Sequence, residues 1–407
     1  MIAQTSEAFV PAARLSRIQP SPSTAAAARV RELKDAGRRV LDLTVGEPDA
    51  DTPEHIKRAA IAAIEAGETK YTPVNGTPRL RAAIRASLVR THGVEYSDAE
   101  ITVGGGGKQV LFLALMASLD PGDEVIVPAP YWVSYPDMVR ANEGTPVFAA
   151  TTSATGYRLT AEALEDLLTE RTRWLILNSP GNPTGAIYTE PELGAIAEVL
   201  RRHPRVLVLS DEIYSEISFT GSPAPSLVAV APDLRDRVLV VSGVSKSYAM
   251  TGWRLGYAAG HPRLIRAINT LQSQTSSCPS SISQAAAAAA LEGPQEVITE
   301  AVERYRERRD AALVGLRRIP GLVPLAPDGA FYLFVDCAGL IGRTTPDGRV
   351  LADDQDVTLY LLDHAGVAVI QGSAYGRSPF FRISFATDVD TITASVAAIG
   401  AAVEALA

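Results

Sequence analysis

Between about residues 100 and 260, short apolar runs rich in β-branched residues alternate with longer stretches of helical pattern. Each run is followed by glycine, proline or a polar residue. Such runs are typical of strands that are buried on both faces of a parallel sheet and covered by helices. The predicted strands are Asp123–Pro128, Thr145–Ala149, Arg173–Asn178, Val206–Ser210 and Val238–Ser242. We therefore predict an α/β fold, in which ligands bind beyond the carboxyl ends of the strands.

Three helices are predicted outside this region from periodic apolar positions and boundary residues. One covers Thr24–Ala36 and ends at Gly37, a residue type common at helix C-termini. The second covers Pro53–Ala66, with Thr52 as its N-cap and proline at its first position. The third, Glu296–Leu316, is long and charged on one face.

The C-terminal part, from Gly329 onward, has a different pattern. Three strand-like segments, FYLFVD, VAVI and FRISFAT, accompany a helix expected near Asp356–His364. This predicts a separate α+β unit. The chain of 407 residues is long enough for one large and one smaller domain.

The overall composition argues against several classes of protein. An apolar fraction of 46% and a charged fraction of 21% are typical of globular enzymes. A net charge of -8 argues against a nucleic acid or an anionic membrane as the main partner. No run of about 18 uninterrupted apolar residues and no signal-like N-terminus is found, so we expect a cytoplasmic protein. The histidines and the two cysteines, Cys278 and Cys337, lack metal-ligand spacing, so no metal site is predicted.

Lys246 lies in the segment SGVSKSYAMTGWRLGY, just beyond a predicted buried strand. A lysine at the mouth of a sheet is partly desolvated, which lowers its pKa and lets the neutral amine attack an aldehyde. An isolated lysine in a loop is usually an ordinary surface residue, so its neighbours must decide between the two interpretations. The chain contains only five lysines, namely Lys34, Lys57, Lys70, Lys108 and Lys246.

Two other predicted strands end in polar residues. VLVLSDEIY places Asp211 and Tyr214 after one strand, and RWLILNSPGNPTG places Asn182 in a turn after another. Asp211 could cap the next helix, or it could pair with the protonated ring nitrogen of a cofactor. The Asn182 segment could also be a plain tight turn.

The segment ITVGGGGKQV has four glycines, Gly104–Gly107, before a helix that we expect to begin near Lys108. Glycines let backbone amides approach an anion at a positive helix terminus, and phosphate groups are commonly bound in this way. Trp132, in PYWVSYP, offers a flat ring near the same edge of the sheet, although an indole is more often part of a core.

Together these segments resemble a fold-type I pyridoxal-phosphate (PLP) aminotransferase of the aspartate aminotransferase family, in its bacterial class I subgroup. The resemblance runs from about Arg14 to the C-terminus. It implies a mostly parallel central sheet in a large PLP-binding domain, residues 51–295. Residues 1–50 and 296–407 would form the smaller α+β domain. The landmarks, in family order, are LTVGEPDADTPEHI, KYTPVNG, GGGGKQ, PYWVSYP, NSPGNPTG, SDEIY, SGVSK, MTGWRLGY and FRISFAT.

The resemblance implies the contacts of the cofactor. Lys246 would hold PLP as a Schiff base and, once freed by the substrate, would move a proton between substrate and cofactor. Asp211 would bind the pyridinium nitrogen, while Tyr214 and Asn182 would hydrogen-bond the ring 3′-oxygen. Trp132 would stack on the ring. The phosphate would be bound by Arg254, Ser245, the backbone around Gly106, Gly107 and Lys108, and Tyr71 of the neighbouring subunit in a homodimer with shared active sites.

The chain departs from the family pattern at two places. Family members often carry serine or threonine where this chain has Gly104 and Gly105, and serine where it has Gly243. We therefore expect phosphate binding to depend more on backbone amides, on Ser242 and on Ser245.

The resemblance also implies contacts with the substrate. Arg382 would bind the α-carboxylate through its planar, bidentate guanidinium, with Gly46 beside it. Trp132 and Asn182 would contact the substrate as well. Lys108 would face the distal carboxylate of aspartate or glutamate, unless it only solvates the start of a helix.

The N-terminal segment PSPST matches the part of the bacterial subgroup that closes over the substrate, through Ser21 and Ser23. Relatives that also accept prephenate tend to carry threonine where Ser23 falls, so the resemblance supports prephenate less than aspartate.

The resulting hypothesis is an enzyme that moves the amino group of an L-amino acid, expected to be aspartate, to a 2-oxo acid, expected to be 2-oxoglutarate, by ping-pong exchange. One alternative keeps the fold and changes the substrate or the reaction: a transaminase for prephenate/glutamate, aromatic, alanine or specialised biosynthetic substrates, or a PLP oxidase or lyase. Another alternative is a non-enzymatic PLP sensor, which the acidic charge balance disfavours.

Overall fold

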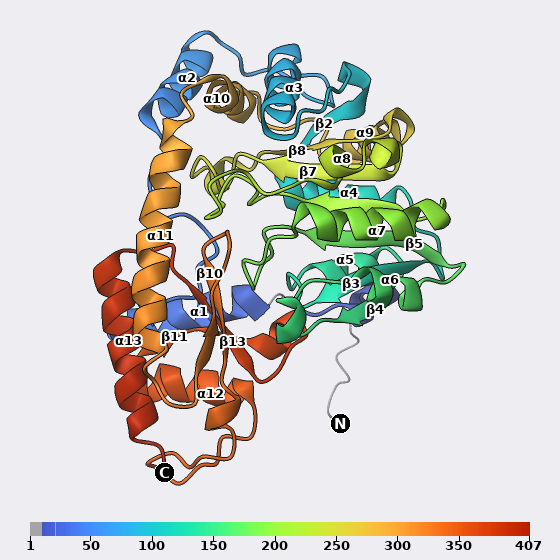
Figure 1. Cartoon of the computed structure of the whole chain (residues 1–407). Helices are drawn as coiled ribbons and strands as arrows, with labels where there is room; N and C mark the ends of the chain where they lie inside the picture. Colours follow the sequence, from blue (N-terminus) through green and yellow to red (C-terminus); the bar gives the residue numbers. More distant parts are fainter. Residues whose placement is uncertain (1–9, 21) are drawn as a thin grey trace, which may run out of the picture.

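The computed structural model describes residues 10–20 and 22–407. The described chain contains a large seven-stranded sheet, a four-stranded sheet and a short two-stranded sheet. The long helix α11 (Glu296–Leu316) runs along one side of the molecule, from the end near the large sheet to the part that holds the smaller sheets (Figure 1). Its bounds are those predicted from the sequence.

The large sheet has the strand order β2-β8-β7-β6-β5-β3-β4. Neighbours from β4 to β7 pair in parallel, whereas β8 is antiparallel to both β7 and β2. The prediction of a mostly parallel α/β sheet is therefore confirmed. The strands are β2 (Ile101–Gly104), β3 (Glu124–Ala129), β4 (Thr145–Ala150), β5 (Thr172–Asn178), β6 (Leu207–Asp211), β7 (Val238–Gly243) and β8 (Gly256–Ala259).

Alternate residues of the central strands face two different cores. In β3, Val125 and Val127 belong to one cluster, with side chains from α4 (Gly107–Met116), α5 (Tyr135–Ala141) and α9 (Pro262–Thr275). Ile126 belongs to the other cluster, beneath the opposite helical layer. That layer consists of α6 (Ala161–Leu167), α7 (Glu190–Arg202) and α8 (Leu227–Val230). Because the sheet is covered on both faces, its open carboxyl edge is where a ligand can enter.

Three helices pack together at one end of the large sheet, at the top of Figure 1: α2 (Glu54–Glu65), α3 (Pro78–His92) and α10 (Ser281–Glu292). The predicted N-cap of α2 is wrong, because Pro53 occupies that position and no side chain caps the helix. The hydroxyl of Thr52 instead donates to the carbonyl of Ala249 (2.6 Å) and accepts from the indole of Trp253 (2.9 Å). The hydroxyl of Thr52 thus bonds to residues far away in the sequence, whereas the local pattern predicted that it would cap the helix.

The smaller part of the fold combines segments from the N-terminal and C-terminal parts of the described chain. Strand β1 (Leu41–Asp42) pairs in parallel with β11 (Val367–Ala368). The four-stranded sheet is antiparallel, with the order β12-β13-β10-β9. Its strands are β9 (Val323–Leu325), β10 (Tyr332–Asp336), β12 (Ile370–Gln371) and β13 (Phe380–Ser384).

Helices α1 (Pro22–Asp35), α12 (Asp354–Tyr360) and α13 (Val389–Glu404) accompany these smaller sheets (Figure 1). The helix expected near Asp356–His364 is α12, which continues as a π-helical segment over Leu361–Ala365.

Candidate active site

A cavity of about 520 Å³ opens where the carboxyl ends of β5 and β6 face strands β10 and β13 of the smaller sheet. Residues from both sheets line it, including Asp211 of β6 and Arg382 of β13. The cavity therefore lies at the sheet edge that the sequence pattern indicated. Most of the predicted site residues line it: Gly46, Gly107, Lys108, Trp132, Asn182, Asp211, Tyr214, Ser245, Lys246, Arg254 and Arg382.

Lys246 lies in the segment that follows β7, and its amine donates a hydrogen bond to the carbonyl of Gly46. Burial lowers the pKa of Lys246 to about 8; the positive charges of Arg382 and Arg254 lower it too, while Glu47 opposes them. An ordinary lysine is almost wholly protonated at neutral pH, whereas this amine has an appreciable neutral fraction. The interpretation of Lys246 as a plain surface residue is thereby excluded.

Asp211 ends β6 with only 5% of its surface exposed. Its carboxylate accepts hydrogen bonds from the hydroxyl of Tyr135 (2.6 Å) and from the amide of Ile213 (3.3 Å). Burial raises the pKa of Asp211 to about 6, although the hydrogen bond from Tyr135 opposes the shift. Both donors are neutral, so a cation that entered the cavity beside Asp211 would stabilise its charged form.

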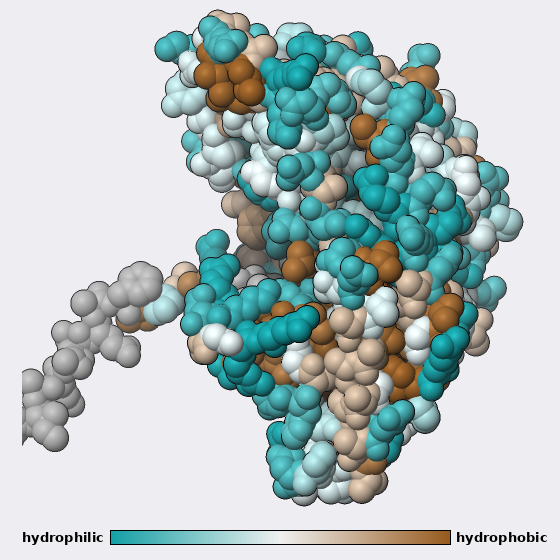
Figure 2. Space-filling model, turned by 90° about the vertical axis from the view of Figure 1, so that its left-hand side faces the viewer, coloured by the Kyte–Doolittle hydropathy of each residue, from teal (hydrophilic) through white to brown (hydrophobic). Residues whose placement is uncertain are grey.

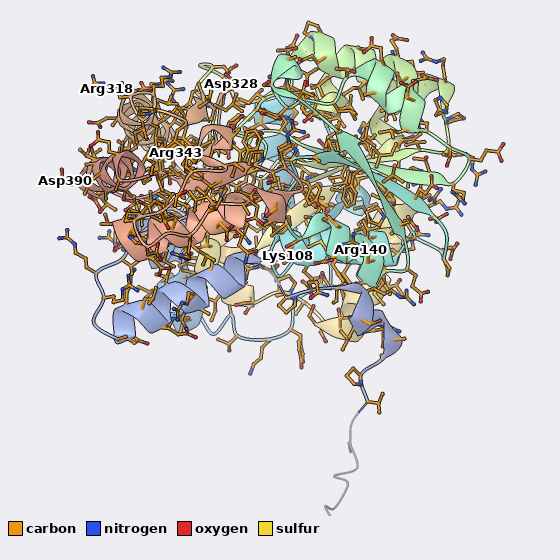
Figure 3. The ribbon with its side chains drawn as sticks, turned by 90° about the horizontal axis from the view of Figure 1, so that it is seen from below. Lys108, Arg140, Arg318, Asp328, Arg343 and Asp390 are labelled. Carbon is orange, nitrogen blue, oxygen red and sulfur yellow. The ribbon has the colours of Figure 1, made fainter. Side chains whose placement is uncertain are left out.

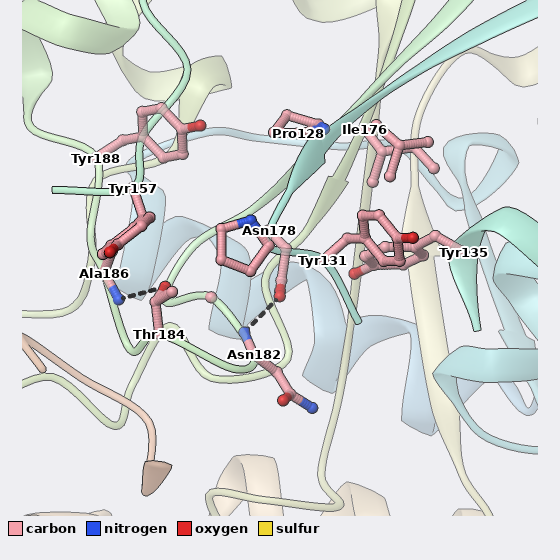
Figure 4. Close-up of a pocket in the computed structure, with 13 residues that line it drawn as sticks. Pro128, Tyr131, Tyr135, Tyr157, Ile176, Asn178, Asn182, Thr184, Ala186 and Tyr188 are labelled. Carbon is pink, nitrogen blue, oxygen red and sulfur yellow. Dashed lines mark hydrogen bonds between the residues drawn. The ribbon is translucent and has the colours of Figure 1, made fainter. Parts of the chain in front are cut away.

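The turn after β5 presents Asn182 to the cavity. The side-chain oxygen of Asn178 accepts from the amide of Asn182 (2.9 Å), and its side-chain nitrogen donates to the carbonyl of Asp211 (2.9 Å). In Figure 4 the side chain of Asn182 points away from the small hollow behind the turn, which holds about 30 Å³ and is bounded in part by Tyr131 and Tyr157. The turn thus holds Asn182 in a fixed orientation, which goes beyond the alternative of a plain tight turn.

Arg382 supplies a buried cation from β13, with 3% of its surface exposed. Its Nη1 donates to the side-chain oxygen of Asn182 (3.0 Å) and its Nη2 to the carbonyl of Thr44 (2.7 Å). The guanidinium lies over the ring of Tyr332, 4.3 Å from its centroid. Its hydrogen-bond acceptors are neutral, so the positive charge remains available to an anion in the cavity.

The glycine run brings the start of α4 close to the backbone of β8. Gly106 precedes the helix with a φ of 100°, a conformation that favours glycine. A Cβ on Gly256 would lie 2.2 Å from the nitrogen of Gly107, so this approach requires glycine. The first amides of α4, those of Gly107 and Lys108, point out of the helix N-terminus, where an anion is favoured.

Two groups of the predicted anion site have hydrogen-bond partners within the protein. The amide of Gly106 donates to the carbonyl of Gly104 (2.7 Å), so it is engaged within the turn. The hydroxyl of Ser242 donates to the carbonyl of Glu212 (3.3 Å) and does not line the cavity, whereas Ser245 does. Arg254 lies next to the turn, where its guanidinium donates to the carbonyls of Thr251 (2.9 Å) and Gly105 (3.4 Å).

Lys108 lies over the ring of Trp132, with its Nζ 4.7 Å from the ring centroid. Burial and the nearby charge of Arg254 lower the pKa of Lys108. Seen from below, Lys108 lies near the middle of the molecule, close to the start of α1, and Ile18 and Gln19 line the adjoining hollow (Figure 3). Lys108 therefore adds to the cavity a basic side chain that is separate from Arg382, Arg254 and Lys246.

Two described residues of the predicted site, Gly106 and Tyr71, do not line the cavity. Ser21 lies outside the described residues, as does the side chain of Ser23. Tyr71 is described, but 90% of its surface is exposed and it does not line the cavity of its own chain.

Several residues that line the cavity were not predicted from the sequence, and three of them carry ionisable groups: Glu47, Tyr135 and Tyr332. Glu47 directly follows Gly46, and its carboxylate accepts from the hydroxyl of Thr251 (2.6 Å). Tyr135 comes three positions after Trp132. Residues three apart on a helical turn lie on the same side, so this spacing could have indicated that both face the cavity. Tyr332 carries no local signal, because it looks like an ordinary core residue of a strand.

Within residues 10–20 and 22–407, no group of three or more histidine, cysteine, aspartate or glutamate side chains is arranged to hold a metal ion. None of the helices in this part of the chain is long and apolar enough to cross a membrane.

This fold and this cavity define a class of enzyme that works through a reactive lysine. A partly neutral amine, a buried carboxylate and an anion-binding helix terminus meet at one sheet edge, with a separate arginine for a carboxylate substrate. This combination suits a phosphorylated aldehyde cofactor.

The comparisons with known proteins agree with this class. The family described as aminotransferase class I and II matches residues 38–399. The aspartate aminotransferase of Rhizobium meliloti (strain 1021) is 51% identical over 398 residues, which cover 98% of this chain and 97% of the relative. An aspartate/prephenate aminotransferase of Cereibacter sphaeroides is 50% identical, over 95% of this chain and 97% of the relative.

Solved structures give the same result. The crystal structure of an aspartate aminotransferase from Rhizobium meliloti matches with a TM-score of 0.96 at 50% identity, covering 98% of this chain and 100% of that one. The aspartate aminotransferase of Thermus thermophilus with maleate matches with a TM-score of 0.90 at 38% identity, over 97% and 100%. The chain belongs to the class I and II aminotransferases, and it is a PLP-dependent aminotransferase of fold type I.

Proposed function

We propose that this enzyme moves the amino group of aspartate to 2-oxoglutarate, with PLP bound at Lys246. The observation that carries the choice of substrate is the pair of separate cations in the cavity, Arg382 and Lys108. A dicarboxylic amino acid needs one cation for each carboxylate. The names of the relatives support the same substrate, and so does the maleate, a dicarboxylate, named with the Thermus thermophilus structure.

The residues present fit PLP. Asp211 is a buried carboxylate whose hydrogen-bond donors are neutral, and a pyridinium nitrogen would give it a cationic partner. The free amides of Gly107 and Lys108, with Arg254, suit a phosphate. When bound, PLP supplies the aldehyde that captures an amine and the ring that withdraws electrons from it.

The chain's own side chains then have separate tasks. Arg382 binds the α-carboxylate and fixes the substrate α-carbon near Lys246. The amine of Lys246 removes the α-proton and returns a proton, because its lowered pKa lets it exchange protons near neutral pH. Trp132 covers one side of the cavity, and Tyr214 and Asn182 hold the cofactor oxygen. Lys108 selects for the distal carboxylate.

The substrate proposal is tested by Lys108→Met in single-turnover reactions with aspartate and with alanine. A lost charge-assisted hydrogen bond is worth about 1.5–3 kcal/mol, so the rate constant per substrate concentration should fall about 10- to 100-fold for aspartate. The value for alanine, which has no distal carboxylate, should change less than about twofold. Lys57→Met, on the exposed side of α2, is the matched control. Equal losses for both substrates would contradict the assignment to acidic substrates.

Prephenate is a second candidate amino acceptor. Several relatives about 50% identical to this chain are named aspartate/prephenate aminotransferases or probable members of that group. Prephenate also carries two carboxylates, so Arg382 and Lys108 can serve it in the same way. Amino transfer from glutamate to prephenate by the purified enzyme would establish this activity, and its absence under conditions that give aspartate turnover would exclude it.

We also propose a homodimer in which Tyr71 reaches the phosphate site of the neighbouring subunit. Tyr71 is 90% exposed, and Ile61 and Ile64 of α2 are each about half exposed (53% and 52%). Figure 2 shows apolar side chains gathered at the upper end of one face, the end where Figure 1 places α2. Sedimentation should give twice the chain mass, and Tyr71→Phe should weaken PLP binding without dissociating the dimer.

The proposed domain division is residues 51–295 for the large domain and residues 1–50 with 296–407 for the smaller one. Strands of the large sheet all lie between Ile101 and Ala259, and those of the smaller sheets come from both ends of the described chain. A cytoplasmic location stays a prediction.

A further inference from the structure

Tyr332 places a phenol at the junction of the cofactor and substrate regions. It lies in β10 with 1% of its surface exposed, and it lines the cavity. Its hydroxyl oxygen lies 2.8 Å from the hydroxyl oxygen of Tyr214, across 118 residues of sequence. The two rings meet edge to face, with centroids 5.7 Å apart. This is the geometry of a direct hydrogen bond between two buried phenols.

The surroundings of Tyr332 restrict the direction of that hydrogen bond. The guanidinium of Arg382 covers the ring at 4.3 Å and can only donate. On the other side, a Cβ on Gly46 would lie 3.3 Å from the Tyr332 hydroxyl, so the backbone there is close. Each phenol has one proton to donate. If Tyr214 gives its proton to a cofactor oxygen, the hydrogen bond between the phenols can persist only with Tyr332 as the donor.

We propose that Tyr332 is a positioning residue for amino transfer: it donates to Tyr214 and thereby directs the single proton of Tyr214 to the 3′-oxygen of PLP. This inference rests on the proposed binding of PLP at Lys246. A donor that itself accepts a hydrogen bond becomes more polar, so Tyr332 strengthens the bond from Tyr214 to the cofactor. Because Arg382 stacks on the same ring, Tyr332 also links the carboxylate-binding arginine to the cofactor-binding phenol.

Three charged groups lie near Tyr214 and influence its hydroxyl. They are Asp211 of β6, Arg382 of β13 and the amine of Lys246, which lies 5.9 Å from the centroid of the Tyr214 ring. Phe331 closes the remaining side, edge to face at 5.4 Å. Replacing Tyr332 by phenylalanine removes one hydroxyl and leaves these groups in place, so the effect of that hydroxyl can be isolated.

The test is a pH titration of the visible absorbance of lysine-bound PLP in Tyr332→Phe. A hydrogen bond to the 3′-oxygen favours the form of lysine-bound PLP that has no proton on the lysine nitrogen. Weakening that hydrogen bond should therefore raise the midpoint of the titration by about half a pH unit, a threefold change in proton affinity. Tyr214→Phe should raise the midpoint further. The double variant should match Tyr214→Phe alone, because Tyr332 acts through Tyr214. Tyr305→Phe is the control, since Tyr305 packs on Phe331 without lining the cavity.

A second measurement covers the case in which Tyr332→Phe does not fold. Site-specific 3-fluorotyrosine at position 332 keeps the shape and makes the phenol a stronger donor, so the midpoint should fall. An unchanged midpoint in whichever of these two proteins folds, with a shifted midpoint in Tyr214→Phe, would overturn the role of Tyr332. A wild-type protein that takes up no PLP would overturn the proposed function instead.

Discussion

The hydroxyl of Tyr135 lies 2.6 Å from Oδ2 of Asp211, and both side chains are buried. Tyr135 comes from α5, on the face of the sheet that carries α4 and α9, while Asp211 ends β6. The phenol donates to Oδ2, while Oδ1 accepts from the amide of Ile213, and Asp211 lines the cavity. Tyr135 thus favours the charged form of a carboxylate that burial would otherwise neutralise.

Tyr135→Phe should therefore weaken PLP binding. The hydrogen bond lowers the pKa of Asp211, so its loss raises that pKa further and leaves less carboxylate to pair with a pyridinium nitrogen. A hydrogen bond to a charged group is worth about 1.5–3 kcal/mol, which corresponds to a Kd at least about tenfold higher. Fluorescence titration of the apoenzyme with PLP measures this, and Tyr131→Phe in the same segment is the control. Equal affinities for Tyr135→Phe and wild type would refute the coupling.

The rate of PLP capture by the apoenzyme should rise with pH and level off above a midpoint near 8. The pKa of Lys246 is lowered to about 8, and the amine reacts only when neutral, above that value. At pH 7 about one amine in ten is then neutral, against fewer than one in a thousand for an ordinary lysine. Stopped-flow absorbance across pH 6 to 10 gives the profile.

Glu47→Gln gives the matched variant for that profile. The Glu47 charge opposes the lowering of the Lys246 pKa, so its removal should move the midpoint below 8. Glutamine can still accept the hydrogen bond from Thr251. A wild-type midpoint near 10 would show that the Lys246 amine is well solvated and that its burial has no effect.

Gly256→Ala should impair the phosphate site selectively. The new Cβ would lie 2.2 Å from the nitrogen of Gly107 and 2.6 Å from the carbonyl carbon of Gly106, and backbone atoms have no rotamer by which to move away. The start of α4 must shift, so PLP affinity should fall at least about tenfold, as for a lost charge-assisted contact. Pyridoxal, which lacks the phosphate, should lose much less. Gly252→Ala is the control, because nothing lies within 4 Å of its Cβ position.

Asp49→Asn should destabilise the fold by about 2 kcal/mol. Both oxygens of Asp49 accept from Arg308 at 2.7 Å, which fixes the segment after Gly46 to α11. Arg308 is only 9% exposed, so the variant leaves a buried charge with a weaker partner. Urea unfolding of the apoenzyme measures the loss. Arg29→Met, which breaks an exposed pair with Glu32, should change stability by less than about 0.5 kcal/mol.

The five central strands were predictable to within one residue because each is an apolar run with a sharp polar or proline boundary. Strands β2 and β8, which lie together at one side of the large sheet, were not predicted, since each has four residues and one of its ends is glycine. Their pairing depends on partners far away in the sequence. The Thr52 cap failed for a related reason: its hydroxyl is held by Ala249 and Trp253, which no local pattern reveals.

The same distinction applies to the site. Lys246, Asp211 and Asn182 could be predicted because each lies at or just after the end of a strand, within a recognisable segment. Tyr135 and Tyr332 gain their positions from contacts 76 and 118 residues distant in sequence. A tyrosine in a core strand has the same sequence pattern whether its hydroxyl lines a cavity or bonds to a neighbouring carbonyl. The sequence alone therefore does not distinguish the two cases.

The hydrogen bond from Arg382 to the carbonyl of Thr44 spans 338 residues. During synthesis, Lys246 and Asp211 leave the ribosome well before Arg382 does. A partly made chain can therefore carry the lysine and the carboxylate, while its carboxylate-binding arginine and strand β13 do not yet exist. The order of the residues along the chain thus means that the reactive amine is made long before the arginine that binds the α-carboxylate of its substrate.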